Sequence, residues 1–514
     1  MIVLVALSVL YLIVIIAGVI SWRQSDLILP PYALGGGLLV VWLLVFVGRP
    51  DRPMVVSLIP WSAQGPFNAQ PTLLIDHVSW LFFQVLVSLI LAYVIMFPEL
   101  DRNQVWVLGL GCAASMGILA GNILTLLFSW MLVDMLQFGF HFRNRPPDVR
   151  HDQFVLSFAF RLWGPFLVVY AHFFSLDAGL PNTFQVIAPR VAGLLILASG
   201  LRYFLSLPRL SPGDQAGLKV GQLTLIHSIT GTVSVLITIR SAASGIPPNW
   251  KLPFYGLSGS ILLICGLWWV SSRDLAGGRN SWLAGWFAFI SLAAVNGQQM
   301  ASISWALAAL LSGNILFNLP SQSGLRTAAV GLFGFGILGW PYTPLWPGAD
   351  LFSEGLWGVL WALLFGLFYA GGVRQILQSD DLRTDHEPMV EVLHMAGVVF
   401  LVMIHLLLSF LEGLAPASAQ FWHQGWRFLL PAGILIPVLL AENRVQFPYV
   451  GISKLKHALS DLPGTISIRV VHLGRVFSAF VMGLFHILEG RGGLIWSLVG
   501  VFFLLSLLAA SGGG

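Results

Sequence analysis

Charge is what this sequence has least of. Only 9% of its 514 residues are Asp, Glu, Lys or Arg, whereas about a quarter of the residues of a soluble domain are charged. Hydrophobic residues make up 57% of the chain, and its mean hydropathy is +0.84. These proportions exclude a soluble globular protein and indicate a chain that lies in lipid. The net charge of +4 comes from scattered residues, which argues against a nucleic-acid partner.

Cysteine is also nearly absent. The two cysteines, Cys112 and Cys265, lie inside apolar runs, and neither has a second Cys or a His at a metal-ligand spacing. They are expected to be small buried side chains and not ligands or a disulfide. The glycines of 35–37 and of 331–339 lie within or beside apolar runs, where glycine permits close helix contact. We therefore predict no cofactor, no metal and no catalytic residue.

No stretch without apolar runs is long enough for a soluble domain of ~100 residues. The apolar runs predict an all-α polytopic membrane protein with about 14 to 16 transmembrane helices. Residues 1–20 have no basic region and no cleavage site, so we interpret them as the first membrane helix and not as a signal peptide. The expected spans are 1–20, 29–48, 72–97, 104–121, 122–141, 152–174, 187–207, 218–240, 253–272, 281–298, 300–318, 325–346, 353–377, 388–412, 424–441 and 493–511.

Basic residues in the loops give an orientation. Arg143, Arg145 and Arg150 make the loop after the fifth span the most basic short loop, and other basic loops also follow odd-numbered spans. Because cytoplasmic loops carry an excess of Lys and Arg, these loops are expected inside and the N-terminus outside. Arg49 and Arg52 are exceptions. We expect the bacterial inner (cytoplasmic) membrane as the location.

Ionisable residues within spans are functional candidates by default, because a charge in lipid costs several kcal/mol. Three of them, Asp134, Arg202 and His227, are placed deepest by the span assignment. The others, nearer the span ends, are Asp76, His77, His141, Arg161, His172, Asp350, Glu354, His394, His405 and Glu412.

Four motifs occur in a recognisable order. Residues 74–82 (LIDHVSWLF) resemble a "D-G-L-S-x-L-F" helix start, and 120–130 (AGNILTLLFSW) resemble "A-G-N-L-L-x-L-F-x-x-W-E". From Asp214 to His227 the spacing is that between "W-L-P-D-A" and "S-A-L-I-H-A", and 339–346 (GWPYTPLW) resemble "G-x-P-P-x-x-G-F". The sequence is thus similar to the antiporter-like membrane subunits of respiratory complex I, of multisubunit sodium/proton antiporters and of membrane-bound hydrogenases.

The resemblance implies about fourteen helices with two inverted five-helix repeats, each with a discontinuous helix. It divides the chain into N-terminal helices (1–103), a first repeat (104–240), a second repeat (241–378) and C-terminal helices (379–514), the last with an amphipathic segment near 443–490. It also implies a proton path. A carboxylate on the fifth helix pairs with a lysine on the broken seventh, and a His or Lys on the eighth passes the proton to a Lys or Glu on the broken twelfth.

The first half of this path is altered here. Met131 stands where the resemblance expects the glutamate, and Asp134 lies one helical turn further on the same face. Tyr203 stands in place of the lysine of the seventh helix. Its neighbour Arg202 is a fixed cation that cannot release a proton. We expect Arg202 to lie within salt-bridge reach of Asp134, directly or through one water, because an unpaired charge at that depth costs several kcal/mol.

The second half is altered as well. The expected "H-A-F-F-K-A-L-L-F" falls on 309–317, with Ala309 and Gly313 in place of the His and the Lys. Ala349 replaces the lysine of the twelfth helix, and Asp350 beside it matches an acidic residue that often follows. Of the expected path, His227 keeps both its place and its chemistry.

Two functions remain open, together with a less favoured third. The chain is expected to be a membrane subunit of a proton- or cation-translocating complex of the NADH–quinone oxidoreductase or Mrp type, with an atypical path through His227, Asp134, Arg202 and Asp350. Alternatively it is a scaffold subunit that keeps the antiporter fold without moving ions. The third hypothesis is a stand-alone secondary transporter whose pocket is lined by some of the 20 Trp. The expected partners are sister antiporter-like and other membrane subunits of a redox-linked ion pump, the lipid bilayer, and protons or sodium ions; no catalysis is expected of the chain alone.

Overall fold

The computed structural model describes residues 1–23, 31–58, 70–98, 102–143, 161–177, 183–205, 219–272, 275–320, 323–337, 339, 343–353, 355–378 and 388–413. The expected spans 424–441 and 493–511 and the amphipathic segment 443–490 lie outside these residues, as do Asp214 and Glu354. The side chain of His141 is likewise not described.

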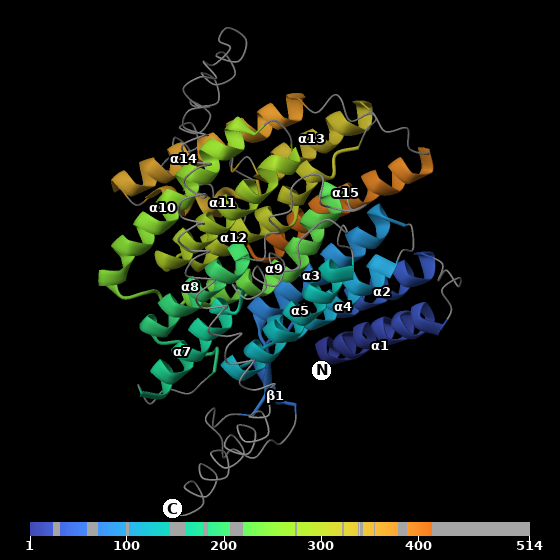
Figure 1. Cartoon of the computed structure of the whole chain (residues 1–514), viewed down its shortest axis with the longest axis horizontal. Coiled ribbons are helices and arrows are strands. Elements are labelled where there is room, and N and C mark those ends of the chain that lie inside the picture. The colour runs from blue at the N-terminus through green and yellow to red at the C-terminus, as the bar shows by residue number, and fades with distance from the viewer. Residues whose placement is uncertain are drawn as a thin grey trace, which may run out of the picture. The chain divides into compact units, whose positions relative to one another are not determined.

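Helices make up nearly all of the described chain, which confirms an all-α polytopic membrane protein (Figure 1). Eight of the described helices are long and apolar enough to cross a membrane. The α-helices are α1 (Ile2–Arg23), α2 (Pro31–Val47), α3 (His77–Met96), α4 (Arg102–Ile118), α5 (Ile123–Arg143), α7 (Trp163–Asp177), α8 (Pro189–Leu205), α9 (Val220–Ala242), α10 (Pro248–Ser271), α11 (Leu275–Val295), α12 (Gln299–Leu310), α13 (Ser323–Ile337), α14 (Gly355–Gln378) and α15 (Pro388–Leu411).

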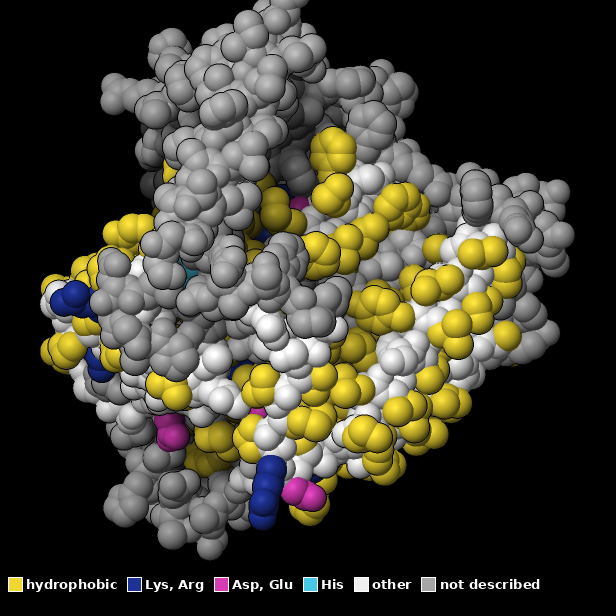
Figure 2. All heavy atoms as spheres, turned by 90° about the horizontal axis from the view of Figure 1, so that it is seen from below, with side chains coloured by type: hydrophobic (Ala, Val, Ile, Leu, Met, Phe, Trp, Pro, Cys, Tyr) yellow, Lys and Arg dark blue, Asp and Glu magenta, His cyan; other side chains and the backbone are white. Residues whose placement is uncertain are grey.

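Burial separates inner helices from outer ones. The apolar windows of α3 and α9 are each 89% buried, whereas those of α1 and α10 are 22% and 28% buried. Figure 1 shows α9 and α12 near the centre, with α1 and α10 toward opposite edges. On the face in Figure 2, hydrophobic side chains are spread widely and charged ones are few, as expected of a surface that meets lipid or neighbouring subunits.

Two expected spans are not continuous α-helices. The span 300–318 is α12 followed by a 3₁₀ helix, η1 (Ser312–Phe317), and the change occurs at Leu311 with φ −101° and ψ −72°. The span 325–346 was wrong at its end, because α13 stops at Ile337 and a second 3₁₀ helix, η2 (Trp346–Ser353), begins where the span was expected to end. Both 3₁₀ helices are largely buried, so their backbone groups must find partners inside the protein.

A short hairpin precedes α3 and was not predicted. Strands β1 (Met54–Ser57) and β2 (Thr72–Ile75) are antiparallel, and Met54 pairs with Ile75. Leu74 N–H also donates to the Leu119 carbonyl at the end of α4. The hairpin therefore fixes the entry of the chain into α3.

The predicted role of the two glycine groups in helix contact was only partly right. Gly37 on α2 faces Ile13 of α1, where an added Cβ would lie 3.1 Å from Ile13 Cδ1. Gly35, Gly36 and Gly331 have open space where a side chain would be. Close approach is therefore limited to particular members of each group.

Two ionic contacts hold the start of α3. The Asp76 carboxylate accepts two hydrogen bonds from Arg240, at the end of α9, with N–O distances of 2.8 and 2.9 Å. Asp76 is also the N-cap of α3, because it accepts a hydrogen bond from Ser79 N–H. The adjacent His77 Nε2 lies 2.5 Å from the carboxylate of Glu412, just beyond α15. These contacts connect α3 with α9 and with the end of α15.

We expect the Asp76–Arg240 pair to make stability depend on pH. Burial raises the pKa of Asp76, but Arg240 and Ser79 together hold it below its usual value of 3.8. A carboxylate with a lowered pKa stabilises the fold above its usual pKa, and this contribution is lost as the pH falls through the lowered value. Asp76→Asn, which keeps a good N-cap, should therefore cost about 1.5–3 kcal/mol near pH 7, the usual contribution of hydrogen bonds to a charged group.

Thermal unfolding in detergent from pH 7 down to pH 3 checks this. The parent and Asp76→Asn should differ most at pH 7 and converge at the acid end. Asp51→Asn, at an exposed carboxylate in the loop before β1, is the matched control and should not differ from the parent. Equal stability of Asp76→Asn and the parent at pH 7 would contradict the pairing.

Candidate functional site

A buried ion pair joins α5 and α8. Arg202 Nη1 lies 2.6 Å from Asp134 Oδ2, and the side chains are 5% and 3% exposed. The sequence predicts this contact, because an unpaired charge at that depth is costly, and the structure confirms it. Met131, at the position where the resemblance expects a glutamate, is instead 52% exposed. Asp134 thus provides the buried carboxylate that Met131 does not.

The pair has further buried polar neighbours. Arg202 Nη2 donates to the Trp130 carbonyl at 3.1 Å, and its guanidinium lies 4.7 Å from the centre of the Trp130 ring. Arg161, just before α7, donates to Gln137 Oε1 at 2.8 Å and interacts electrostatically with both Asp134 and Arg202. Two buried arginines therefore share one buried carboxylate in the described part of this cluster.

His227 lies on α9 and is 2% exposed. The ring of Tyr203 meets it edge-on, with 4.6 Å between ring centres, and Tyr203 also stacks on Phe287 of α11 at 4.5 Å. Arg161 and Arg279 are both within electrostatic reach of His227. Aromatic rings and cations are thus among the groups around this imidazole.

Thr230, three residues after His227, makes its described hydrogen bonds within α9. Its hydroxyl donates to the carbonyls of Ile226 and His227 on its own helix, at 3.1 and 3.2 Å. Ser228, the residue after His227, instead points across to η1, where its hydroxyl bonds the Asn314 side chain at 3.0 and 3.1 Å. Ser228 thus gives α9 a polar contact with the 3₁₀ helix that follows α12.

Asp350 is placed apart from the other predicted path residues. It lies in η2, and its carbonyl accepts hydrogen bonds from Gln298, before α12, and from Ser353. Asn314, which contacts Ser228, lies beyond the other end of α12. Twelve residues of α-helix separate these ends by about 18 Å. The structure thus brings Asp134 and Arg202 together and leaves Asp350 at the far end of α12.

Sequence reasoning missed some members of the site. Gln137 lies three residues after Asp134, on the same helix face, and that spacing could have identified it. Arg279 is not among the candidates from the sequence, yet it lies in α11 and is 2% exposed. Arg240 is not among them either, because no pattern in a single sequence connects it with Asp76.

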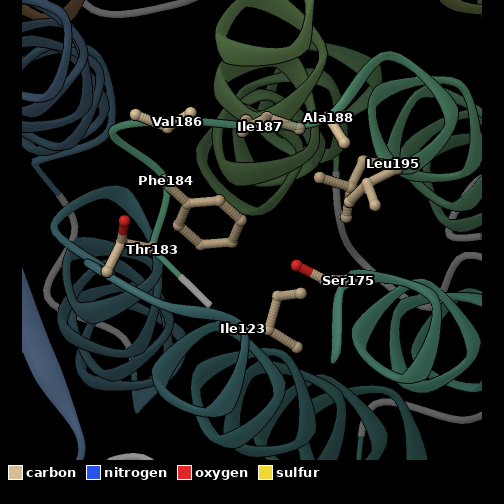
Figure 3. A pocket seen from close by; sticks show the side chains of 9 residues that line it. Ile123, Ser175, Thr183, Phe184, Val186, Ile187, Ala188 and Leu195 are labelled. Atoms are coloured by element: carbon tan, nitrogen blue, oxygen red, sulfur yellow. The ribbon is translucent and has the colours of Figure 1, made fainter. Parts of the chain in front are cut away.

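Three of the described tryptophans pack against one another in the interior. Trp282, Trp286 and Trp305 pack in series with ring centres 5.3 and 5.4 Å apart, and all three are buried. A pocket between α5, α7 and α8 has a volume of about 10 Å³, room for about one water. It is lined by Ile123, Ser175, Thr183, Phe184, Val186, Ile187, Ala188, Val191 and Leu195 (Figure 3). These tryptophans are packing residues.

The sequence matches no protein-family model and no curated protein. Solved structures do share its fold. A chain of the Mrp complex from a Dietzia species superposes with a TM-score of 0.70 at 13% identity, over 100% of this chain and 63% of that one. This chain therefore spans less than two thirds of the Dietzia chain.

Two further structures have the same fold. A chain of an archaeal respiratory membrane complex, the membrane-bound sulfane sulfur reductase, gives a TM-score of 0.66 at 13% identity over 98% of this chain and 100% of that one. A chain of respiratory complex I from Thermus thermophilus gives 0.53 at 16% identity over 78% and 97%. The antiporter-like fold that the sequence motifs predict is confirmed.

Proposed function

We propose that the protein is a membrane subunit of a proton- or cation-translocating complex of the Mrp or NADH–quinone oxidoreductase type. The observation that carries the proposal is the buried Asp134–Arg202 pair at 2.6 Å, within a fold shared with chains of such complexes. Sister membrane subunits are the proposed partners, because the described residues suggest no energy source of their own.

Asp134 is the group that can change its charge in this pair. An arginine does not release a proton in proteins, so Arg202 can hold the Asp134 carboxylate in place but cannot relay a proton itself. Arg161 lies close enough to compete for the same carboxylate. A shift of Asp134 between the two cations would change the field at His227, which Arg161 also reaches. This arrangement can couple a local rearrangement to proton uptake without a lysine.

A scaffold function is the second candidate, and the surroundings of His227 favour it. The imidazole lies against Tyr203, where the resemblance expects a lysine, and Thr230 bonds its own helix. Under this proposal the fold supplies surfaces for neighbouring subunits, and ions move elsewhere in the complex.

The assembly purified through this chain, reconstituted into vesicles, tests the proposal. With an imposed pH or sodium gradient, the vesicles should exchange protons or sodium faster than protein-free vesicles, as read by a pH-sensitive dye inside them. If the assembly is intact and its exchange rate does not exceed that of protein-free vesicles, the translocating function is wrong and the scaffold function is the remaining candidate.

We also propose that the N-terminus faces the outside of a bacterial inner membrane and the loop 143–150 the cytoplasm. A single cysteine at Asn144, in a chain without Cys112 and Cys265, should react with an impermeant maleimide only after the cells are permeabilised. A cysteine at Arg52, in the loop after the second span, should react in intact cells. The opposite labelling pattern would show that the proposed orientation is wrong.

A further inference from the structure

One buried histidine has no place in the path described so far. His405, on α15, is 0% exposed, and its Nδ1 lies 2.7 Å from the hydroxyl oxygen of Ser312 in η1. Its Nε2 is also buried and has no hydrogen-bond partner among the described residues. A buried polar nitrogen without a partner is costly. It marks a place where a water or a proton acceptor would bind.

Ser312 lies two residues from the contact that η1 makes with α9. Asn314 bonds Ser228 on α9, and Ser228 follows His227 in the chain. The short 3₁₀ helix therefore has one polar contact with α9 and another with α15. Both contacts are made by side chains of η1, which begins after the break at Leu311.

A third helix, α13, packs against the Ser312–His405 contact, and its Gly336 leaves room for that contact. A Cβ added at Gly336 would lie 2.1 Å from Ser312 Oγ and 3.6 Å from His405 Nδ1. Any side chain at this position must therefore displace the Ser312 hydroxyl. Gly331, on the same helix, has nothing within 4 Å of an added Cβ.

We propose that Ser312 and His405 form a second proton-transfer point, which takes the path from α9 to α15 and bypasses Asp350. This inference rests on the proposed translocating function. The Ser312 hydroxyl donates its proton to His405 Nδ1 as it accepts one, through water, from the α9 side. His405 then releases a proton from Nε2 to a water and becomes neutral again. No net proton stays on either residue.

The rate of proton movement by the reconstituted full-length complex tests the proposed role of Ser312 and His405. His405→Asn keeps an amide near the position of Nδ1 but cannot relay a proton, so the rate of dye response should fall about a hundredfold while the assembly stays intact. Gly336→Ala should also lower the rate, because it displaces Ser312, whereas Gly331→Ala should keep the parental rate.

The outcomes separate this inference from the proposed function. Parental rates in His405→Asn, together with loss in His227→Ala, would overturn the α15 route and leave the translocating function intact. A parent complex that moves no ions would overturn both. If His405→Asn fails to assemble, histidine ¹⁵N NMR of the parent decides: a relay requires Nε2 to exchange its proton with water, and an unexchanging single tautomer would contradict it.

Discussion

Replacing one member of the Asp134–Arg202 pair is expected to destabilise the protein by about 3–5 kcal/mol, because each single change leaves an uncompensated buried charge. Asp134→Leu leaves Arg202 and Arg161 without their shared carboxylate, and Arg202→Met leaves Asp134 with Arg161 alone. Arg190→Met, at an exposed position of the same helix α8, is the matched control and should change stability little. Thermal unfolding in detergent measures the difference.

The double variant Asp134→Leu/Arg202→Met distinguishes stability from function. Apolar side chains of similar volume often replace a buried ion pair without loss, so the double variant should regain most of the lost stability. The recovery should be incomplete, since Arg161 no longer has Asp134 nearby. Ion movement should remain absent, because no titratable group is left at the pair. A stable double variant that still moves ions at the parental rate would remove the pair from the path.

The sequence predicts the Asp134–Arg202 pair better than it predicts the contacts around the pair. Depth in the membrane makes pairing of Asp134 and Arg202 nearly obligatory, and the resemblance places both on helices that pack together. The contact of Arg161 with Gln137 depends on how α5 and α7 meet, which no pattern within either helix determines. Arg161 was accordingly recognised as a candidate without a partner.

The resemblance implies a discontinuous twelfth helix, but the break within the span 300–318 was not predicted. Residues 300–318 are apolar enough for one span, and the resemblance offers no proline there. After the change to a 3₁₀ helix at Leu311, side chains of η1 contact other helices, Asn314 with Ser228 on α9 and Ser312 with His405 on α15. Such tertiary contacts are not visible in local propensity.

Asp350 shows the limit of reasoning from a motif. Its position next to Ala349 suggested a replacement for a missing lysine, and whether it carries protons remains a prediction. Its place at the far end of α12 from Asn314 shows that adjacency to a motif position in sequence does not give adjacency to the other polar residues in space. Conversely, His405 contacts Ser312, at the start of η1, although the two residues are 93 positions apart in the chain.

His227→Ala is expected to stop ion movement in the reconstituted complex while leaving the complex assembled, if His227 relays protons. The imidazole lies within electrostatic reach of Arg161, and the next residue, Ser228, contacts η1. Its loss would interrupt the path, because proton transfer needs a hydrogen-bonded group or water at each step. His227→Gln should be equally inactive, since it keeps polarity but cannot carry a proton.

The scaffold function predicts the reverse. Packing of His227 against Tyr203 would then be its whole role, so His227→Gln should leave ion movement by the complex at the parental rate, and His227→Ala should lower stability alone. Thr230→Val provides the matched control on the same helix, because the Thr230 hydroxyl bonds only backbone carbonyls in the described contacts. Comparing the dye response of these variants with that of the parent complex decides between the relay and the scaffold, since only a relay makes both His227 variants inactive while Thr230→Val remains active.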